Sequence, residues 1–181
     1  RRMPGHLYSG DSETVDAGLG VGDLFFSRQG WQQVAAREGD PAEEFEPLDR
    51  LLTAVRQASF SEFANYAEGA IDLDRYATFD ALDVVFAGNE HDYLSNHKFY
   101  YDPYRNLLEP IAWSFRGFQY EPALNLIDHP LLIRLKMTPG YLTRRNRTIY
   151  SLLMDKASVP NIRSRTDRLF ETMAAHLSTD P

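Results

Sequence analysis

The spacing of apolar residues changes near the middle of this chain, and that change most constrains its fold. Between residues 41 and 86 the apolar side chains recur every three or four positions, as they do on one face of an α-helix. After residue 97 they form short runs bounded by turn residues, which is typical of strands. The polar residues 88–97 separate the two patterns. We therefore predict an α+β fold, mainly helical, with a small β-hairpin directly after the polar stretch.

Three helices are expected before the polar stretch. The first begins near Pro41. The second begins at Ser59, which forms a capping box with Glu62. Asp72 is expected to cap the third helix, which ends at Gly88 because glycine favours helix C-termini.

Three further helices are expected in the last third of the chain. A short one covers residues 131–137, and the next begins at Thr138 with Pro139 in the first helical position. The last begins near Pro160 and is expected to bury one apolar face, made of Ile162, Leu169, Met173 and Leu177.

The remaining elements are two strands and a leading segment. Residues 98–101 and 107–113 read as strands joined by a turn at 102–106. Residues 1–30 are rich in Gly, Asp and Ser, so we expect the leading segment, residues 1–40, to be irregular, with one short strand or docked apolar segment. Residues 41–181 would then form the helical domain.

Composition excludes several classes of function. The net charge of −7 argues against general nucleic-acid binding. No apolar run approaches the roughly 20 residues needed to span a bilayer, so no membrane span is expected. The sequence contains no cysteine, which excludes disulfides and thiolate metal sites.

The charge is unevenly distributed. Between residues 131 and 170 the only acidic side chains are Asp155 and Asp167. Two interpretations of this basic region stay open, namely a solvated helix face and a surface for an acidic partner. The region contains nine basic side chains, Arg134, Lys136, Arg144, Arg145, Arg147, Lys156, Arg163, Arg165 and Arg168.

The polar stretch carries the candidate chemistry. Asp92 and Asn96 are four residues apart, between an expected helix and an expected strand. In protein kinases an Asp of the catalytic loop accepts the proton of the substrate hydroxyl, and an Asn in the same loop binds magnesium. Asp and Asn are also common in turns, where they bond the local backbone, so a purely structural role is the alternative.

Four motifs in order carry a family resemblance. Residues 71–76 read Ile-Asp-Leu-Asp-Arg-Tyr, and Asp92 and Asn96 follow. An aromatic strand with Tyr-Tyr-Asp-Pro at 100–103 and Pro-Ile-Ala-Trp at 110–113 complete the series. Over roughly residues 40–155 the chain resembles the CotH-like spore-coat protein kinase family.

The resemblance implies an atypical protein-kinase-like fold that binds ATP and Mg and phosphorylates serine in coat proteins. It implies a bacterial protein, often exported or at the cell surface, whose protein partner is a coat or exported protein. By position, Asp92 matches the catalytic aspartate and Asn96 the metal-binding asparagine. The nucleotide-binding strands of the N-terminal lobe would lie upstream of Arg1, and residues 1–40 would continue from them.

The chain departs from the family where two metal-binding aspartates are expected. Ser114 and Arg116 occupy those positions. A neutral hydroxyl and a cation are poor ligands for magnesium, whereas a guanidinium suits phosphate. We therefore expect a pseudokinase, or a nucleotide- or anion-binding module, in which Arg116 contacts the phosphate.

Two alternatives remain. The first is an active, divergent serine kinase in which Asp92 is the base and Asn96 and Glu90 hold the metal. The second is a helical protein-interaction domain that uses the basic C-terminal half, for which charge reversal at Arg144 and Arg145 would weaken binding to an acidic partner.

Overall fold

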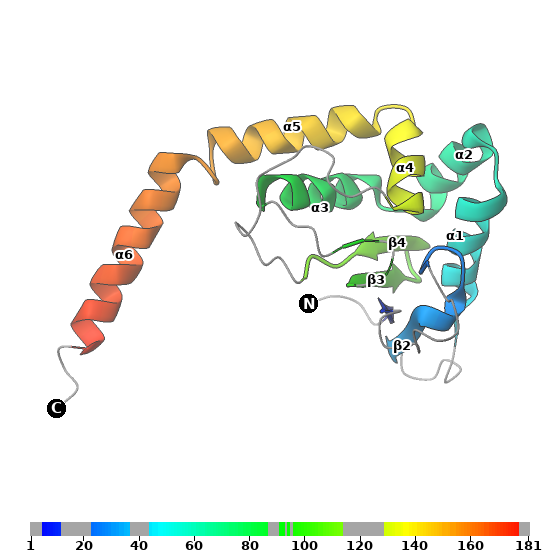
Figure 1. Cartoon of the computed structure of the whole chain (residues 1–181), viewed down its shortest axis with the longest axis horizontal. Coiled ribbons are helices and arrows are strands. Elements are labelled where there is room, and N and C mark those ends of the chain that lie inside the picture. Colours follow the sequence, from blue (N-terminus) through cyan, green and yellow to red (C-terminus); the bar gives the residue numbers. More distant parts are fainter. Residues whose placement is uncertain are drawn as a thin grey trace.

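The computed structural model describes residues 5–11, 23–36, 44–86, 91–92, 94, 96–113 and 129–177. In these ranges the fold is α+β and mainly helical, as predicted (Figure 1). The strands are β1 (His6–Gly10), β2 (Trp31–Ala35), β3 (His97–Asp102) and β4 (Leu107–Pro110), with a 3₁₀ turn η1 (Arg28–Gly30) before β2. The helices are α1 (Glu46–Gln57), α2 (Phe60–Ala70), α3 (Leu73–Phe86), α4 (Pro130–Met137), α5 (Tyr141–Met154) and α6 (Val159–Leu177).

The predicted hairpin, β3–β4, is part of a larger sheet. Its four described strands are antiparallel in the order β2-β1-β3-β4. The leading segment therefore contributes two strands to the sheet of the helical region, where we expected one short strand or a docked segment. The second strand was missed because a five-residue strand such as β1 carries too short a pattern to be recognised in the sequence.

One face of the sheet forms the main core. Tyr8 of β1 lies opposite Phe99 of β3, and Gly10 lies opposite both Trp31 and His97. Tyr8, Trp31 and Phe99 are almost completely buried. The Trp31 ring packs directly over Gly10, since a Cβ atom there would lie 2.8 Å from the ring. Any larger residue would have to displace the indole.

Helix α3 lies between the sheet and α5 (Figure 1). Its Tyr76 ring stacks on Phe99 of the sheet, with ring centroids 6.3 Å apart. On the other side, Tyr141 of α5 is fully buried and its hydroxyl donates to Asp80 of α3 over 3.2 Å. The core is therefore layered as sheet, α3 and α5.

Helices α1, α2 and α4 complete the core beside this stack. The three-and-four spacing in α1 correctly predicted its buried face. The capping box at Ser59 is also confirmed, with Ser59 Oγ accepting from the Glu62 N–H and Glu62 accepting from the Ser59 N–H. The buried contact residues of α1, α2 and α4 include Leu48, Leu51, Leu52, Val55, Phe63, Ala67, Leu131 and Leu135.

The predicted start of α5 is wrong. Thr138 does not cap α5, because it closes α4, with its N–H donating to Leu135 O and its hydroxyl to Arg134 O. Gly140 precedes α5 and has a φ of 76°. Pro139 and Gly140 thus form a tight turn in which glycine adopts the left-handed conformation at little cost.

The prediction that α6 buries an apolar face is also wrong for its described side chains. Ile162, Leu169 and Met173 are exposed, as is every α6 side chain from residue 159 to 174. The helix points away from the rest of the molecule at the end of α5 (Figure 1). Amphipathic spacing predicted the helix correctly but could not reveal what covers its apolar side. The side chain of Leu177 lies outside the described part.

Within the described ranges, no helix combines the length and hydrophobicity needed to cross a membrane.

Candidate functional site around Asp92 and Asn96

The structure places Asp92 and Asn96 on the short loop between α3 and β3. An oxygen of the Asp92 carboxylate accepts a hydrogen bond from the Leu94 N–H over 2.7 Å, which forms a local turn. Asn96 has a φ of 65°, in the left-handed region that asparagine tolerates better than most residues. Both residues therefore shape the loop, as the purely structural interpretation expected.

His91 ties this loop to two other segments. Its Nε2 lies 2.7 Å from the carbonyl oxygen of Trp113, just after β4. Its Nδ1 lies 2.9 Å from the carboxylate of Asp83 on α3. The ring is buried. The segment that leads to Ser114 is thereby held against the loop that carries Asp92.

These contacts determine which atoms of His91 and Asp83 carry protons. A carbonyl oxygen only accepts, so Nε2 of His91 carries a proton. Nδ1 then either accepts from a protonated Asp83 or donates to an ionised one, and the pair holds one further proton between them. Burial raises the pKa of the Asp83 carboxyl, and the hydrogen bond from His91 opposes this effect.

His97 supports the same loop from the first position of β3. Its Nε2 donates to the carbonyl oxygen of Asp92 over 2.6 Å. Burial lowers the pKa of His97 to about 3, with His91 as a further cause. The ring is therefore neutral at physiological pH, and it supports the loop through its hydrogen bond to the Asp92 carbonyl.

His129 is the third buried histidine of the cluster. Its ring meets that of His97 edge-on, with centroids 4.7 Å apart, and stacks on Phe25 at 4.6 Å. Nδ1 accepts the Leu132 N–H over 3.3 Å and so caps α4. Burial lowers the pKa of His129 well below its ordinary value. His129 is therefore the N-cap of α4.

Lys98 lies next to this cluster along β3. Its ammonium group sits 3.4 Å from the centroid of the Trp113 ring, in a cation–π contact. Trp113 therefore has its carbonyl held by His91 and its ring held by Lys98. The 91–96 loop, β3 and the segment after β4, which were all expected to form the site, therefore meet at Trp113.

Three residues expected at the site, Glu90, Ser114 and Arg116, lie outside the described residues. Among the side chains that the structure describes, no group of three or more His, Asp or Glu residues is arranged to hold a metal ion. Both ring nitrogens of His91 are within hydrogen-bonding distance of protein oxygens, which disfavours the histidine as a ligand. The described residues therefore do not make a magnesium site by themselves.

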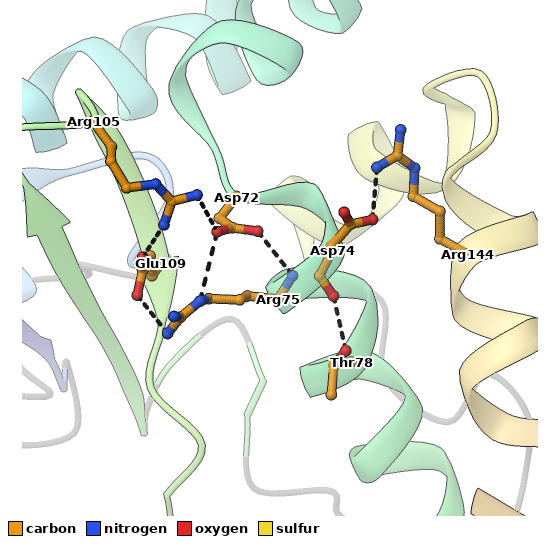
Figure 2. Close-up of polar contacts among 7 residues, drawn as sticks. All are labelled: Asp72, Asp74, Arg75, Thr78, Arg105, Glu109 and Arg144. Atoms are coloured by element: carbon orange, nitrogen blue, oxygen red, sulfur yellow. Dashed lines mark hydrogen bonds and ion pairs between the residues drawn. The ribbon is translucent and has the colours of Figure 1, made fainter. Parts of the chain in front are cut away.

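The Ile-Asp-Leu-Asp-Arg-Tyr motif at residues 71–76 takes part in an ion network with the β3–β4 hairpin (Figure 2). Asp72 caps α3, with its Oδ1 accepting the Arg75 N–H over 3.1 Å. The other oxygen of Asp72 bonds Arg105 of the hairpin turn over 2.8 Å. Glu109 of β4 accepts from Arg75 and from Arg105, each over 2.7 Å, and is almost fully buried. The network fixes the hairpin to the start of α3.

Burial within this network pushes the pKa of Asp72 upward, but hydrogen bonds from the Arg75 N–H and from Arg105 outweigh it, and the net pKa is lowered. Both guanidinium groups are about half-exposed, while Glu109 is covered. The buried carboxylate is satisfied from two sides, so this motif has a structural role.

Two arginines expected to bind an acidic partner are paired with carboxylates of α3. Arg144 pairs with Asp74 over 2.6 Å (Figure 2). Arg145 is buried and lies 3.6 Å from Asp80. Burial raises the pKa of Asp80, and Arg145 opposes that effect. Charge reversal at Arg145 would therefore perturb the α3–α5 contact and would not report on a partner. The Arg144–Asp74 pair is exposed and contributes little to stability.

Sequence reasoning largely missed the histidine cluster. The spacing of His91, His97 and His129 along the sequence carries no periodic signal. The cluster forms because β3, the 91–96 loop and the start of α4 meet in space. No known protein-family model matches the chain, and no curated protein matches it.

Proposed function

We propose that this protein is a CotH-like, kinase-fold pseudokinase that binds a phosphate-bearing ligand such as ATP at the loop carrying Asp92 and Asn96. The observation that carries the proposal is the contact from His91 to the Trp113 carbonyl. It holds the segment before Ser114 beside the Asp92 loop, so that residues from both would face one ligand. In kinases the catalytic loop and the second metal-binding segment have the same order along the chain.

The chemistry of the substituted positions favours binding over phosphate transfer. Transfer depends on positive charge that neutralises the phosphates, which metal ions normally supply. Ser114 and Arg116 occupy the positions at which the family has two metal-binding aspartates. A guanidinium at residue 116 supplies positive charge directly and pairs with phosphate in a bidentate manner.

Nucleotide binding tests this proposal. ATP should raise the unfolding temperature of the purified protein both with magnesium and with excess EDTA. At about 100 times its dissociation constant, the ligand should stabilise the fold by roughly 2.7 kcal/mol. Arg116→Ala should abolish the shift, whereas Arg147→Ala, at an exposed arginine of α5, is the matched control and should retain it.

The active-kinase alternative gives a different result. It requires metal-dependent binding and phosphate transfer to serine that Asp92→Ala abolishes. Asp92 remains suitable for a catalytic role, because its turn with Leu94 fixes the orientation of the carboxylate. Absence of ATP binding under every condition would refute both proposals and leave a binding domain of another kind.

A further inference from the structure

Helix α6 carries an exposed apolar stripe. At 3.6 residues per turn, side chains three and four positions apart share one face of a helix. Exposure of the stripe is 44% for Ile162, 64% for Leu169 and 56% for Met173. Contiguous apolar surface of this kind marks interaction sites. Along the described part of the helix the stripe consists of Val159, Ile162, Thr166, Leu169, Phe170 and Met173.

The end of α5 also exposes apolar side chains. Tyr150, Leu153 and Met154 are 67%, 51% and 65% exposed and precede the turn into α6. No described α6 side chain is buried, so the rest of the described protein does not cover the stripe. An apolar surface at two successive helices is more than the scattered exposure of single residues.

The charges at the edges of the stripe indicate what would cover it. By helical geometry Arg163 lies at one edge and Arg165 at the other, while Arg168 and Glu171 lie on the opposite side of the helix. Asp167 is further from the stripe than Arg163. The charged side chains nearest to the apolar contact are therefore both cationic.

We propose that α6 is a docking helix for an acidic amphipathic helix of a partner protein. Apolar residues spaced by three and four interlock with the same spacing on a facing helix, and the flanking charges select the partner. Glutamate or aspartate beside the partner's apolar seam would pair with Arg163 and Arg165. A second copy of α6 fits less well, because it presents arginine at both edges of its own stripe.

The arginines of this surface belong to the basic region 131–170 but are not the pair chosen for charge reversal. Arg144 and Arg145 pair with Asp74 and Asp80. Arg163 and Arg165 make no ion pair with a described residue and are exposed. The acidic-partner alternative is thus retained, and its surface is narrowed to the α6 part of the basic region.

A pair of designed peptides tests the proposal. Each peptide spans about three heptads with leucine at a and d, and carries either glutamate or lysine at e and g. The labelled peptides are titrated with the purified protein and followed by fluorescence anisotropy. The glutamate peptide should bind and the lysine peptide should not, and raising salt from about 0.05 to about 0.5 M should weaken the binding.

Variants then assign the surface. Arg165→Glu should weaken binding of the glutamate peptide by about tenfold or more, as should Leu169→Ser. Arg168→Glu makes the same charge change on the far side of α6 and should have less than about a twofold effect. All three positions are exposed, so the unfolding temperature should stay near that of the unmodified protein, which a melting curve checks.

Three results would overturn the proposal. One is equal binding of both peptides, or no binding of the glutamate peptide. Another is loss of binding to the same extent in Arg165→Glu and Arg168→Glu. The third is sedimentation showing a dimer that Leu169→Ser dissociates, since the stripe would then be covered by a second copy. None of these results depends on whether the protein binds ATP.

Discussion

The Nε2 atom of His91 lies 2.7 Å from the carbonyl oxygen of Trp113, and the opposite nitrogen of the ring lies 2.9 Å from Asp83. One buried imidazole thus links α3, the 91–96 loop and the segment after β4. Because these contacts are made in a covered site, removing the ring leaves a carboxylate and a carbonyl without their protein partner.

We expect His91→Ala to lower the free energy of unfolding by about 3 kcal/mol. The loss combines a partly buried carboxylate left without its histidine partner with a cavity beside Phe79, whose ring centroid lies 4.7 Å from that of His91. Urea denaturation followed by circular dichroism measures the change. Asp83→Asn is the control, since an amide still donates to Nδ1, and it should cost roughly 1 kcal/mol or less. Equal losses in both variants would contradict the shared-proton arrangement.

Stability should fall as the pH is lowered from 7 to 5. The folded-state pKa of His97 is about 3, below its unfolded value of roughly 6.5, and that of His129 is also depressed. Below about pH 6.5, these two histidines therefore bind protons in the unfolded chain but not in the folded chain. The contribution of these two histidines to the free energy of unfolding is complete above about pH 6.5. Below that pH it falls by about 1.4 kcal/mol for each histidine and each pH unit.

His129→Asn separates this effect from the titration of other groups. Asparagine is a good N-cap, so α4 should remain capped, but it does not titrate. The variant should show a shallower dependence of unfolding free energy on pH between 5 and 7 than the unmodified protein. The measurement is a series of urea titrations at fixed ionic strength, and parallel curves for the two proteins would exclude His129 as a source of the slope.

The ion network around Glu109 should show strong coupling between its two arginines. Arg75→Ala or Arg105→Ala alone leaves Glu109 with one partner, whereas the double variant leaves a buried carboxylate with neither. We expect the double variant to lose about 1 kcal/mol or more beyond the sum of the single losses. A double-mutant cycle by urea denaturation measures this coupling. Additive losses would mean that Glu109 finds water or another donor once the arginines are removed.

Two glycines should respond to alanine in opposite directions. Gly10→Ala should destabilise the fold by about 1–3 kcal/mol, because the new methyl group would lie 2.8 Å from atoms of the Trp31 ring. Gly69→Ala places a methyl group inside α2 with no atom within 4 Å and should stabilise by about 0.5–1 kcal/mol. Thermal melts of both variants test the pair, and a neutral Gly10→Ala would show that the indole moves aside.

Local signals predicted the parts of the fold that local interactions determine. Ser59 and Glu62 marked the start of α2 because a capping box is completed within four residues. Asp72 marked the start of α3 for the same reason. Thr138 was misassigned because a hydroxyl can close one helix or open the next, and only the backbone at Gly140 decides.

The site could be predicted only in outline. Asp92 and Asn96 were found from their spacing, and the structure places them on one loop. His91 and His97, which support this loop, flank it in the sequence, whereas His129 comes from the distant start of α4. The prediction that α6 buries its apolar face was wrong for a different reason. The periodicity of a helix is the same whether its apolar face packs against this chain or against another.

The interior position of β1 has a consequence for how the chain folds. Because β1 pairs with β3, Gly10 must reach His97 before the sheet is complete, and residues 11–96 form the loop that this pairing closes. Such long-range closure delays folding relative to helices that form locally. A cut near residue 40 would therefore separate β1 and β2 from the strand that β1 needs as a neighbour. Adding the two pieces back together should restore the sheet more readily than either piece can form it alone.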